Sequence, residues 1–449
     1  MIRYAQDHIH LLRFFLKWML LVLPVALLSG TASAFFLWSL DAVTTLRWQH
    51  GWLLYLLPGA GVLILWLYQL GGKNAERGNN LLIDEIHRPG GGVPGRMAPL
   101  VLLTSLLTHL FGGSAGREGT AVQIGGSIAG VMGRTFHLTG DDLRMLLMTG
   151  VAAGFGSIFG TPLAGAIFAL EVLTIGKMRY QALIPCLLAS VLGDITCAAW
   201  GTHHTHYSVA FSRTDIPTFS ALNGWLLGKV ALAGALFGLA ALVFSELTHG
   251  VQRLYKTYLP SPYLKPVIGG VILIGLVGLV GTRDYLGLGV VSQTPGGISV
   301  LNAFHAGGVT PWSWFWKLVF TTVTLGSGFK GGEVTPLFFI GACLGNVLAG
   351  WFHAPVDLFA ALGFIAIFAG ASNTPLASTL MGLELFGSDN LLLFALACFV
   401  AYFFSGHTSI YSAQRLGVAK STGRDITHTA PLSRIQTLRQ QAARRSFNA

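Results

Sequence analysis

Five long windows of this 449-residue sequence contain no Lys, Arg, Asp or Glu. They cover residues 18–40, 145–170, 334–356, 358–383 and 391–413. Each is at least as long as the roughly 20 residues that an α-helix needs to cross a bilayer. Only 10% of all residues are charged, whereas a typical soluble domain has about 25%. The buried helices of one large soluble protein would not give five such windows, so the sequence predicts an all-α membrane protein.

The net charge of +10 is concentrated at the two ends of the chain. The N-terminal end carries Arg3, Arg13 and Lys17, and the segment 417–449 carries six Lys or Arg against one Asp. Positive residues that flank membrane helices stay in the cytoplasm, so we expect both termini inside a bacterial plasma (inner) membrane. The first window begins too late and is too long for a cleavable signal peptide. No aromatic interleaving accompanies the basic tail, so we expect no nucleic-acid partner.

The sequence gives no sign of a metal site or a cofactor. The four cysteines are scattered through apolar segments without CxxC or CxxH spacing, which favours a buried packing role. His203, His204 and His206 lie close enough together to bind a metal, but no carboxylate or cysteine completes the set. We therefore expect a solvent-facing loop at this segment, and neither metal nor cofactor.

The chain contains an internal repeat. Residues 113–120 (GSAGREGT) align with residues 328–335 (GFKGGEVT), which places Glu118 opposite Glu333 at an offset of 215. A second pair agrees within two residues: TPLA at 161–164 precedes Glu171, and TPLA at 374–377 precedes Glu384, at an offset of 213. The sequence predicts two homologous halves, 1–211 and 212–416, followed by the basic tail 417–449. Interrupted helices at matching positions of two halves indicate an ion site near the bilayer midplane.

The first repeated segment predicts a glycine-rich loop that leads into a helix. Such a helix start offers unpaired N–H groups and the positive end of the helix dipole, so Gly116, Arg117 and Gly119 are candidate anion-binding residues. Glu118 stands at this start. Its carboxylate can occupy the anion site until protonation releases it, which makes one residue both gate and proton carrier. Helix capping or pairing with Arg117 is the alternative.

The second repeated segment predicts the same geometry in the other half. Glycines precede Glu333, and Pro336 stands in the first turn, where proline is favoured. The amides of Val334 and Thr335 can point at an ion from the opposite side. In one apolar pathway, each of the two carboxylates raises the proton affinity of the other, which suits proton exchange. Capping by Glu333 is the alternative.

Two further segments offer hydrogen-bond donors. Asn79 and Asn80 follow Gly78 at another expected helix start, either as anion ligands or as ordinary N-caps. Tyr411 follows the last long apolar window, where its hydroxyl can face into the protein or lie in an interfacial aromatic belt. The sequence leaves both choices open.

One motif suggests an enzyme. Residues 112–116 match G-x-S-x-G around Ser114, and His109 lies nearby, as in an intramembrane serine hydrolase. A nucleophile elbow needs a preceding strand, however, and residues 96–111 are predicted to be helical. We therefore favour a protein that is not an enzyme.

The motifs resemble those of the CLC family of anion channels and proton-coupled exchangers. Residues 116–120 (GREGT) are similar to that family's G-[K/R]-E-G-P motif, whose gating glutamate falls on Glu118. The TPLA segments and Tyr411 fit as well, and the resemblance covers residues 15–416. It implies an inverted repeat of broken helices of uneven length, about 18 membrane helices per subunit, a homodimer and one ion pathway in each subunit.

The departures from the chloride-type pattern resemble the fluoride/proton antiporter branch of that family. Residues 332–336 read GEVTP instead of G-x-F-x-P, and residues 78–80 read GNN where chloride-type members carry a serine. Val172 stands where many exchangers have an internal glutamate. The resemblance assigns proton handling to Glu333, the central site to Asn79, and anion coordination to Thr335 and Tyr411. We further expect Phe339 to contribute a ring edge.

This resemblance implies proton-coupled export of fluoride across the membrane. The expected partners are fluoride, or chloride in the alternative assignment, together with protons and the lipid bilayer. Fluoride binds its water strongly, so its site must offer strong donors, which Asn, Thr and Tyr side chains and backbone amides supply. A chloride/proton antiporter or a chloride channel on the same scaffold is the alternative function.

Overall fold

The computed structural model describes residues 2–212, 221–421 and 431–435, and these are mostly helical. The resemblance implied about 18 membrane helices. The described residues contain fifteen α-helices of 9 to 48 residues, together with several 3-10 helices of three to six residues. The α-helices are α1 (Ile2–Gln49), α2 (Leu57–Gly71), α3 (Asn79–His87), α4 (Met97–Leu110), α5 (Glu118–Thr135), α6 (Gly140–Phe159), α7 (Pro162–Glu171), α8 (Leu183–Ala199), α9 (Ala221–Tyr258), α10 (Leu264–Val280), α11 (Ser313–Gly326), α12 (Val334–Phe352), α13 (Val356–Ser372), α14 (Pro375–Phe386) and α15 (Leu391–Phe404).

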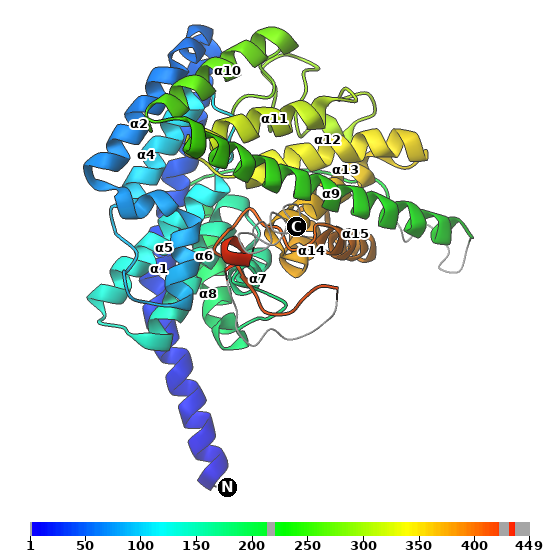
Figure 1. Cartoon of the computed structure of the whole chain (residues 1–449). Helices are drawn as coiled ribbons and strands as arrows, with labels where there is room; N and C mark the ends of the chain where they lie inside the picture. Colours follow the sequence, from blue (N-terminus) through cyan, green and yellow to red (C-terminus); the bar gives the residue numbers. More distant parts are fainter. Residues whose placement is uncertain (1, 213–220, 422–430, 436–449) are drawn as a thin grey trace, which may run out of the picture.

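Helices long and apolar enough to cross a membrane confirm the multi-pass prediction. Within the described residues, six helical stretches meet these requirements of length and composition: Gln6–Gln49, Gly51–Gly71, Gly140–Phe159, Tyr180–Ala199, Gly224–Tyr258 and Val334–Phe352. Figure 1 shows α1 running along one side of the molecule, with its N-terminal end projecting beyond the other helices. The long α9 crosses the opposite part of the molecule at a steep angle to α1.

Two of the charge-free windows are broken helix pairs rather than single spans. The window 145–170 contains the end of α6 and the start of α7, and the window 358–383 contains the end of α13 and the start of α14. Gly160 (φ +70°) and Asn373 (φ +58°) end the first helix of each pair in the left-handed region. A Thr-Pro pair follows each of them, and the residue before a proline avoids the helical region. Local backbone chemistry therefore overrides the apolar composition at matching places in both halves.

Corresponding helix pairs form the centre of each half. Helices α5 and α6 pack against each other in the first half, as α12 and α13 do in the second. A Cβ at Gly125 would lie 2.1 Å from the carbonyl oxygen of Gly150, and one at Gly341 would lie 2.0 Å from that of Gly363. Only glycine allows backbones to approach this closely, as is common where helices pack in lipid. The division into two halves, 1–211 and 212–416, stays a prediction, and its boundary adjoins residues outside the described part.

A short parallel pairing joins the segment after α7 to the segment after α15. Strand β1 (Thr174–Ile175) pairs with β2 (Arg415–Leu416), with Thr174 opposite Arg415. This pairing brings the chain after α15 back to the end of α7. As a result, Tyr411 lies buried in the protein rather than in an interfacial aromatic belt.

Candidate functional site

The starts of α5 and α12 meet in the middle of the protein. The amide of Gly116 donates to the carbonyl of Gly332 over 2.6 Å, and the amide of Gly332 donates back to the carbonyl of Gly116 over 2.7 Å. A Cβ at Gly332 would lie 2.8 Å from the amide nitrogen of Gly119, so the two loops need glycine here. This bridge joins the two repeated segments directly and places both helix N-termini at one point.

The Glu118 carboxylate occupies the space between these two helix starts. It is 1% exposed, and its Oε2 accepts hydrogen bonds from the Thr335 amide (3.0 Å) and the Arg117 amide (3.2 Å). The Thr335 hydroxyl lies 2.5 Å from Oε1 and 2.6 Å from Oε2. A carboxylate from the first half is therefore held by a helix N-terminus of the second half. Amides that hold a carboxylate can hold another anion in its place.

Unused donors remain at the same place. Among the described residues, no group accepts a hydrogen bond from the amide of Gly119 or Val334, the residues that follow Glu118 and Glu333. These are among the N–H groups that a helix start leaves without intrahelical partners. The Arg117 guanidinium stands close by, with its Nε 3.6 Å from Glu118 Oε1. The site thus combines a positive helix end, free donors and a nearby cation, as an anion site requires.

Glu333 faces a different space. It lines a cavity of about 370 Å³ together with Asn79, Lys330 and Tyr411, which we call the asparagine cavity. Next to this cavity, a Cβ at Gly119 would lie 3.1 Å from Asn79 Nδ2 and 3.6 Å from Glu333 Oε2. Gly119, the residue after Glu118 at the start of α5, therefore lies close to the Glu333 carboxylate. The structure brings both carboxylates to the same helix start, on different sides of it.

The two neighbouring asparagines have different surroundings. Asn80 Oδ1 accepts a hydrogen bond from the Ala413 amide over 2.9 Å, which fastens α3 to the chain after α15. Asn79 directs its Nδ2 toward Gly119, and its Oδ1 is buried without a hydrogen-bond partner among the described residues. Of the two, Asn79 is the one next to the helix start that carries Glu118.

Tyr411 and Phe339 are placed differently with respect to the site. Tyr411 is 4% exposed and lines the asparagine cavity. The Phe339 ring instead packs edge-on against Tyr285, with the Lys317 ammonium 5.2 Å from its centroid. The structure does not bring Phe339 to the cavities beside Glu118. The preceding residue, Phe338, lines a small cavity together with Glu118 and Thr335.

Residues that the sequence did not single out complete this small cavity. His204, Tyr207 and Phe364 line it with Phe338, Glu118 and Arg117. The Phe338 and Phe364 rings stack with centroids 3.9 Å apart. Phe338 and Phe339 are both one turn beyond Thr335, so periodicity does not distinguish them and only packing decides. His204 was considered only as part of a histidine cluster.

His204 lies in the loop after α8, at the outer wall of the small cavity. Burial lowers the pKa of its imidazole to about 4, and the positive charge of Arg117 adds to this effect. The ring is therefore neutral near pH 7, and its Nε2 is 3.9 Å from Asp194 Oδ1. Within the described residues, no group of three His, Cys, Asp or Glu could hold a metal ion. The expectation of a simple solvent-facing loop holds for His203 and His206 but not for the partly buried His204.

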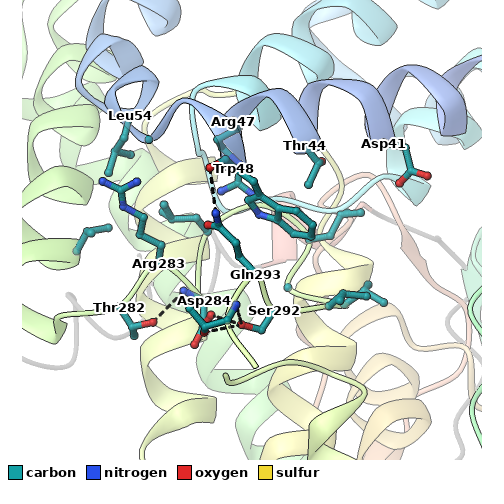
Figure 2. Close-up of a pocket in the computed structure, with 18 of the residues that line it drawn as sticks. Asp41, Thr44, Arg47, Trp48, Leu54, Thr282, Arg283, Asp284, Ser292 and Gln293 are labelled. Carbon is teal, nitrogen blue, oxygen red and sulfur yellow. Dashed lines mark hydrogen bonds between the residues drawn. The ribbon is translucent and has the colours of Figure 1, made fainter. Parts of the chain in front are cut away.

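A larger cavity opens next to the small one and away from the asparagine cavity. It measures about 480 Å³, and we call it the arginine cavity because Arg47, Arg117 and Arg283 line it. Figure 2 shows this cavity between the end of α1 and the loop that follows α10. Arg117, Thr205 and Val290 line both this cavity and the small one, so the two are adjacent. Glu118 thus stands between a cavity system with arginines and one with asparagines.

The second repeated pair of glutamates has a structural role that the sequence did not predict. Glu384 accepts hydrogen bonds from the amides of Leu163 (2.8 Å) and Ala164 (2.9 Å) at the start of α7. Glu171 accepts hydrogen bonds from the amides of Leu376 (3.1 Å) and Ala377 (2.9 Å) at the start of α14. Each half therefore caps a broken helix of the other half.

The geometry around Ser114 does not form a nucleophile elbow. Ser114 follows helix α4 rather than a strand, is 0% exposed, and its Oγ is 2.9 Å from Thr321 Oγ1. The two ring nitrogens of His109 lie 2.8 Å from the Ser105 carbonyl and 3.1 Å from the Ala115 carbonyl. The histidine is thus committed to backbone groups and does not reach the Ser114 hydroxyl.

The fold is that of a multi-pass helical membrane protein in which the N-termini of α5 and α12 meet around the buried Glu118 carboxylate. The chain belongs to the voltage-gated chloride channel (CLC) family, because the model of that family matches residues 60–406. It is 47% identical to the chloride/fluoride channel protein of Pseudomonas syringae pv. tomato, over 92% of this chain and 90% of that protein.

Solved structures place the fold in the same family. A CLC-type fluoride/proton antiporter is 36% identical, with a TM-score of 0.80 over 89% of this chain and 98% of that one. A slow cyanobacterial Cl⁻/H⁺ antiporter is 22% identical and shares the fold, with a TM-score of 0.71 over 87% of this chain and 94% of that one. The CLC resemblance inferred from the sequence motifs is confirmed, and this family consists of channels and transporters rather than enzymes.

Proposed function

We propose that this protein exports fluoride across the membrane in exchange for protons. The observation that carries the proposal is the Glu118 carboxylate, which is hydrogen-bonded to the Thr335 amide and hydroxyl at the start of a helix from the other half. A halide can use the same donors only when this carboxylate leaves. The identity to a chloride/fluoride channel protein and to a fluoride/proton antiporter favours a halide as the ion that replaces it.

In the proposed mechanism, Glu118 is both the gate and the proton carrier. A proton that enters through the arginine and small cavities neutralises the carboxylate, which weakens its hold on the Thr335 donors because charge-assisted hydrogen bonds are about twice as strong as neutral ones. The side chain then moves away, and the anion takes its place. An inward proton gradient and a negative interior both drive the anion out, at about 2.3 kcal/mol per charge for each 100 mV.

Glu333 passes the proton onward in this proposal. It lies on the other side of the α5 start, beside Gly119, and lines the asparagine cavity. No glutamate stands at position 172, where many exchangers of this family carry their internal one. The Glu333 carboxylate therefore supplies a second proton-binding group, between Glu118 and the asparagine cavity.

The donors around the site favour fluoride over chloride. Fluoride holds its hydration water strongly, so its site must replace that water with several good donors. Asn79, Thr335 and the amides of Gly119 and Val334 are such donors, and Tyr411 lines the same cavity as Asn79. Gly116 supports this arrangement through its bridge to Gly332, and Arg117 adds positive charge. Phe339 packs against Lys317 and Tyr285 and lines none of the three cavities described above, so the proposal gives it no role at the anion.

The test is a side-by-side efflux measurement from proteoliposomes loaded with fluoride or chloride, with a pH readout. We expect fluoride efflux to exceed chloride efflux and to move protons in the opposite direction. Faster chloride than fluoride efflux would favour the alternative, a chloride/proton antiporter, for which the fold shared with the cyanobacterial antiporter is the supporting observation. Anion efflux without proton movement would favour a channel.

The assembly and the orientation belong to the same proposal. We propose a homodimer in a bacterial inner membrane with both termini in the cytoplasm, because positive residues surround both ends. This orientation places the arginine cavity, at the end of α1, on the outer side. Cross-linking in liposomes tests the dimer.

A single introduced cysteine tests the orientation. Thr45 is exposed near the end of α1, whereas the four native cysteines are buried, so a cysteine at position 45 is the one that an impermeant thiol reagent reaches. We expect this reagent to label the variant Thr45→Cys in intact cells. Labelling only after the membrane has been permeabilised would reverse the orientation.

A further inference from the structure

The arginine cavity has features that the transport of a small halide does not require. Its volume of about 480 Å³ lies in the range of small-molecule binding sites and far exceeds what one fluoride ion fills. One wall is formed by the last turns of α1, and the other is the loop after α10, which a hydrogen bond from Gln293 Nε2 to the Trp48 carbonyl (3.0 Å) holds against α1. Figure 2 shows Arg47 and Arg283 on these two walls.

Arg47 is a buried cation for which the described part of the chain supplies no ion-pair partner. Its side chain is 9% exposed, and its buried Nε has no hydrogen-bond partner among the described residues. No described carboxylate lies within ion-pair distance of its guanidinium. Gly287 makes room for it, because a Cβ there would lie 2.9 Å from Arg47 Nη2. Burial of an unpaired charge is costly, which indicates that an anion compensates it when the cavity is filled.

Arg283 adds a second positive charge to the same cavity. It is exposed, and within the described part of the chain it too lacks an ion pair. Gly51 accommodates its guanidinium, because a Cβ there would lie 2.0 Å from Nη1. The neighbouring Asp284 does not offset this charge by pairing: its carboxylate accepts hydrogen bonds from Ser292 Oγ (2.7 Å) and the Ile298 amide (2.9 Å).

The donors in this cavity suit an oxyanion better than a halide. A guanidinium presents N–H groups in a planar fork, which two oxygens of one phosphate or carboxylate group match and a single spherical ion does not. Two such forks on different walls favour an anion with several oxygens. Asp41 and Asp284 are the two acidic residues in the lining of this cavity, and their charges oppose this preference. Figure 2 shows Asp41 on α1 at the end of the cavity away from Arg283.

We propose that the arginine cavity binds a small soluble oxyanion of the phosphate class between Arg47 and Arg283. Because Arg117 and Thr205 line both this cavity and the small cavity beside Glu118, the bound oxyanion lies across the route that a halide takes to or from Glu118. This second part rests on the proposed function. The oxyanion removes the positive potential of the cavity and obstructs the route. Phosphate on this side of the membrane therefore slows transport.

Calorimetric titration of inorganic phosphate into the purified full-length protein in detergent tests the binding, without any reliance on the transported ion. We expect Arg283→Gln to weaken binding about tenfold or more, because it removes a charge-assisted contact from an exposed residue whose loss the fold tolerates. Asp41→Asn should strengthen binding. Lys229→Gln, at a half-buried lysine that lines none of the cavities described above, is the matched control and should bind as the unaltered protein does.

Flux measurements add the functional consequence. Phosphate outside proteoliposomes should slow fluoride efflux through the unaltered protein and through Lys229→Gln, and much less through Arg283→Gln. Phosphate binding that Arg283→Gln and Asp41→Asn leave unchanged would overturn the site, and so would binding of fluoride at the same place with equal affinity. Since the titration detects phosphate directly, a failure of fluoride/proton exchange would leave this result intact, and the reverse also holds.

Discussion

Two pairs of repeated glutamates behave differently in this molecule. Glu171 and Glu384 keep the symmetry of the repeat: each accepts hydrogen bonds from two backbone amides at the start of a broken helix in the other half. Glu118 and Glu333 have lost that symmetry. Glu118 accepts hydrogen bonds from Thr335 of the other half, whereas Glu333 lines the asparagine cavity, which residues of both halves form.

The difference shows where the two halves are free to diverge. A cap that fastens one half to the other works equally well in both directions, so nothing favours a change in either copy. A pathway for ions needs two unlike ends, because one end must release what the other admits. We infer that symmetry persists in Glu171 and Glu384, which join the halves, and is lost in Glu118 and Glu333, which face the ion pathway. The predictions that follow test this contrast.

The largest effect is expected at Glu118. Replacing it by Gln removes the ionisable group and should lower proton-coupled fluoride efflux by about 100-fold or more, the lower range for loss of a proton-transferring group. The fold should survive, because Gln can still accept a hydrogen bond from the Thr335 amide. The measurement is fluoride efflux from proteoliposomes with simultaneous recording of pH. Normal coupled efflux from this variant would end the proposed mechanism.

The repeat-related change Glu333→Gln should have a smaller effect. We expect proton movement per fluoride ion to fall about tenfold, while fluoride binding is retained, because this residue lines the cavity but does not hold the Thr335 donors. Equilibrium fluoride binding and coupled efflux are measured on the same preparation. If Glu118→Gln and Glu333→Gln lose transport and binding to the same degree, the proposal that the two carboxylates have different roles is wrong.

The sequence predicted part of this arrangement. The match between residues 113–120 and 328–335 was enough to place Glu118 and Glu333 at two helix starts, because glycine-rich loops and helix N-termini are local features. The hydrogen bond from Thr335 to Glu118 joins residues 217 positions apart and depends on how the halves pack, which no local pattern records. The same reason explains why Phe338 rather than Phe339 lines the cavity beside Glu118.

Other features were beyond the sequence for different physical reasons. Arg47 and Arg283 face one cavity only because a loop folds back onto the end of α1, and neither residue belongs to a recognisable motif. The windows 145–170 and 358–383 read as single spans by composition, although Thr-Pro and a left-handed residue break each of them. The Thr-Pro pairs of the TPLA segments carry this helix-breaking signal, and the expected inverted repeat of broken helices agrees with it. The caps supplied by Glu171 and Glu384 required knowledge of the packing between halves.

A third prediction uses two threonines that the repeat relates, Thr335 and Thr120. The Thr335 hydroxyl donates to Glu118, whereas the Thr120 hydroxyl is 2.7 Å from Ser105 Oγ, in a fully buried position. Thr335→Val removes one hydroxyl contact to the pathway and should lower fluoride efflux about fivefold, the equivalent of one hydrogen bond of about 1 kcal/mol. Thr120→Val is the matched control and should change efflux by less than about twofold. An equal loss of efflux in the two variants would contradict the assignment of Thr335 to the site.

The smallest effect on transport is expected at the symmetric pair. Glu171→Ala and Glu384→Ala each leave two amides at a helix start without their acceptor, and each should lower the free energy of unfolding by about 1–3 kcal/mol. The two losses should be similar, because the two caps have the same geometry, and thermal unfolding of the purified protein in detergent measures both. The glutamine variants keep an acceptor and should be more stable than the alanine variants.

The proton readout makes this last comparison decisive. Glu171 directly precedes Val172, the position where many members of the family carry their internal proton-binding glutamate. If Glu171 were part of the proton route, Glu171→Gln would change the number of protons moved per fluoride ion, whereas Glu384→Gln would not. Equal and unchanged coupling in both glutamine variants is the outcome that a purely structural pair requires. A difference between them would mean that the second repeated pair has also lost its symmetry in function, and the contrast with Glu118 and Glu333 would then fail.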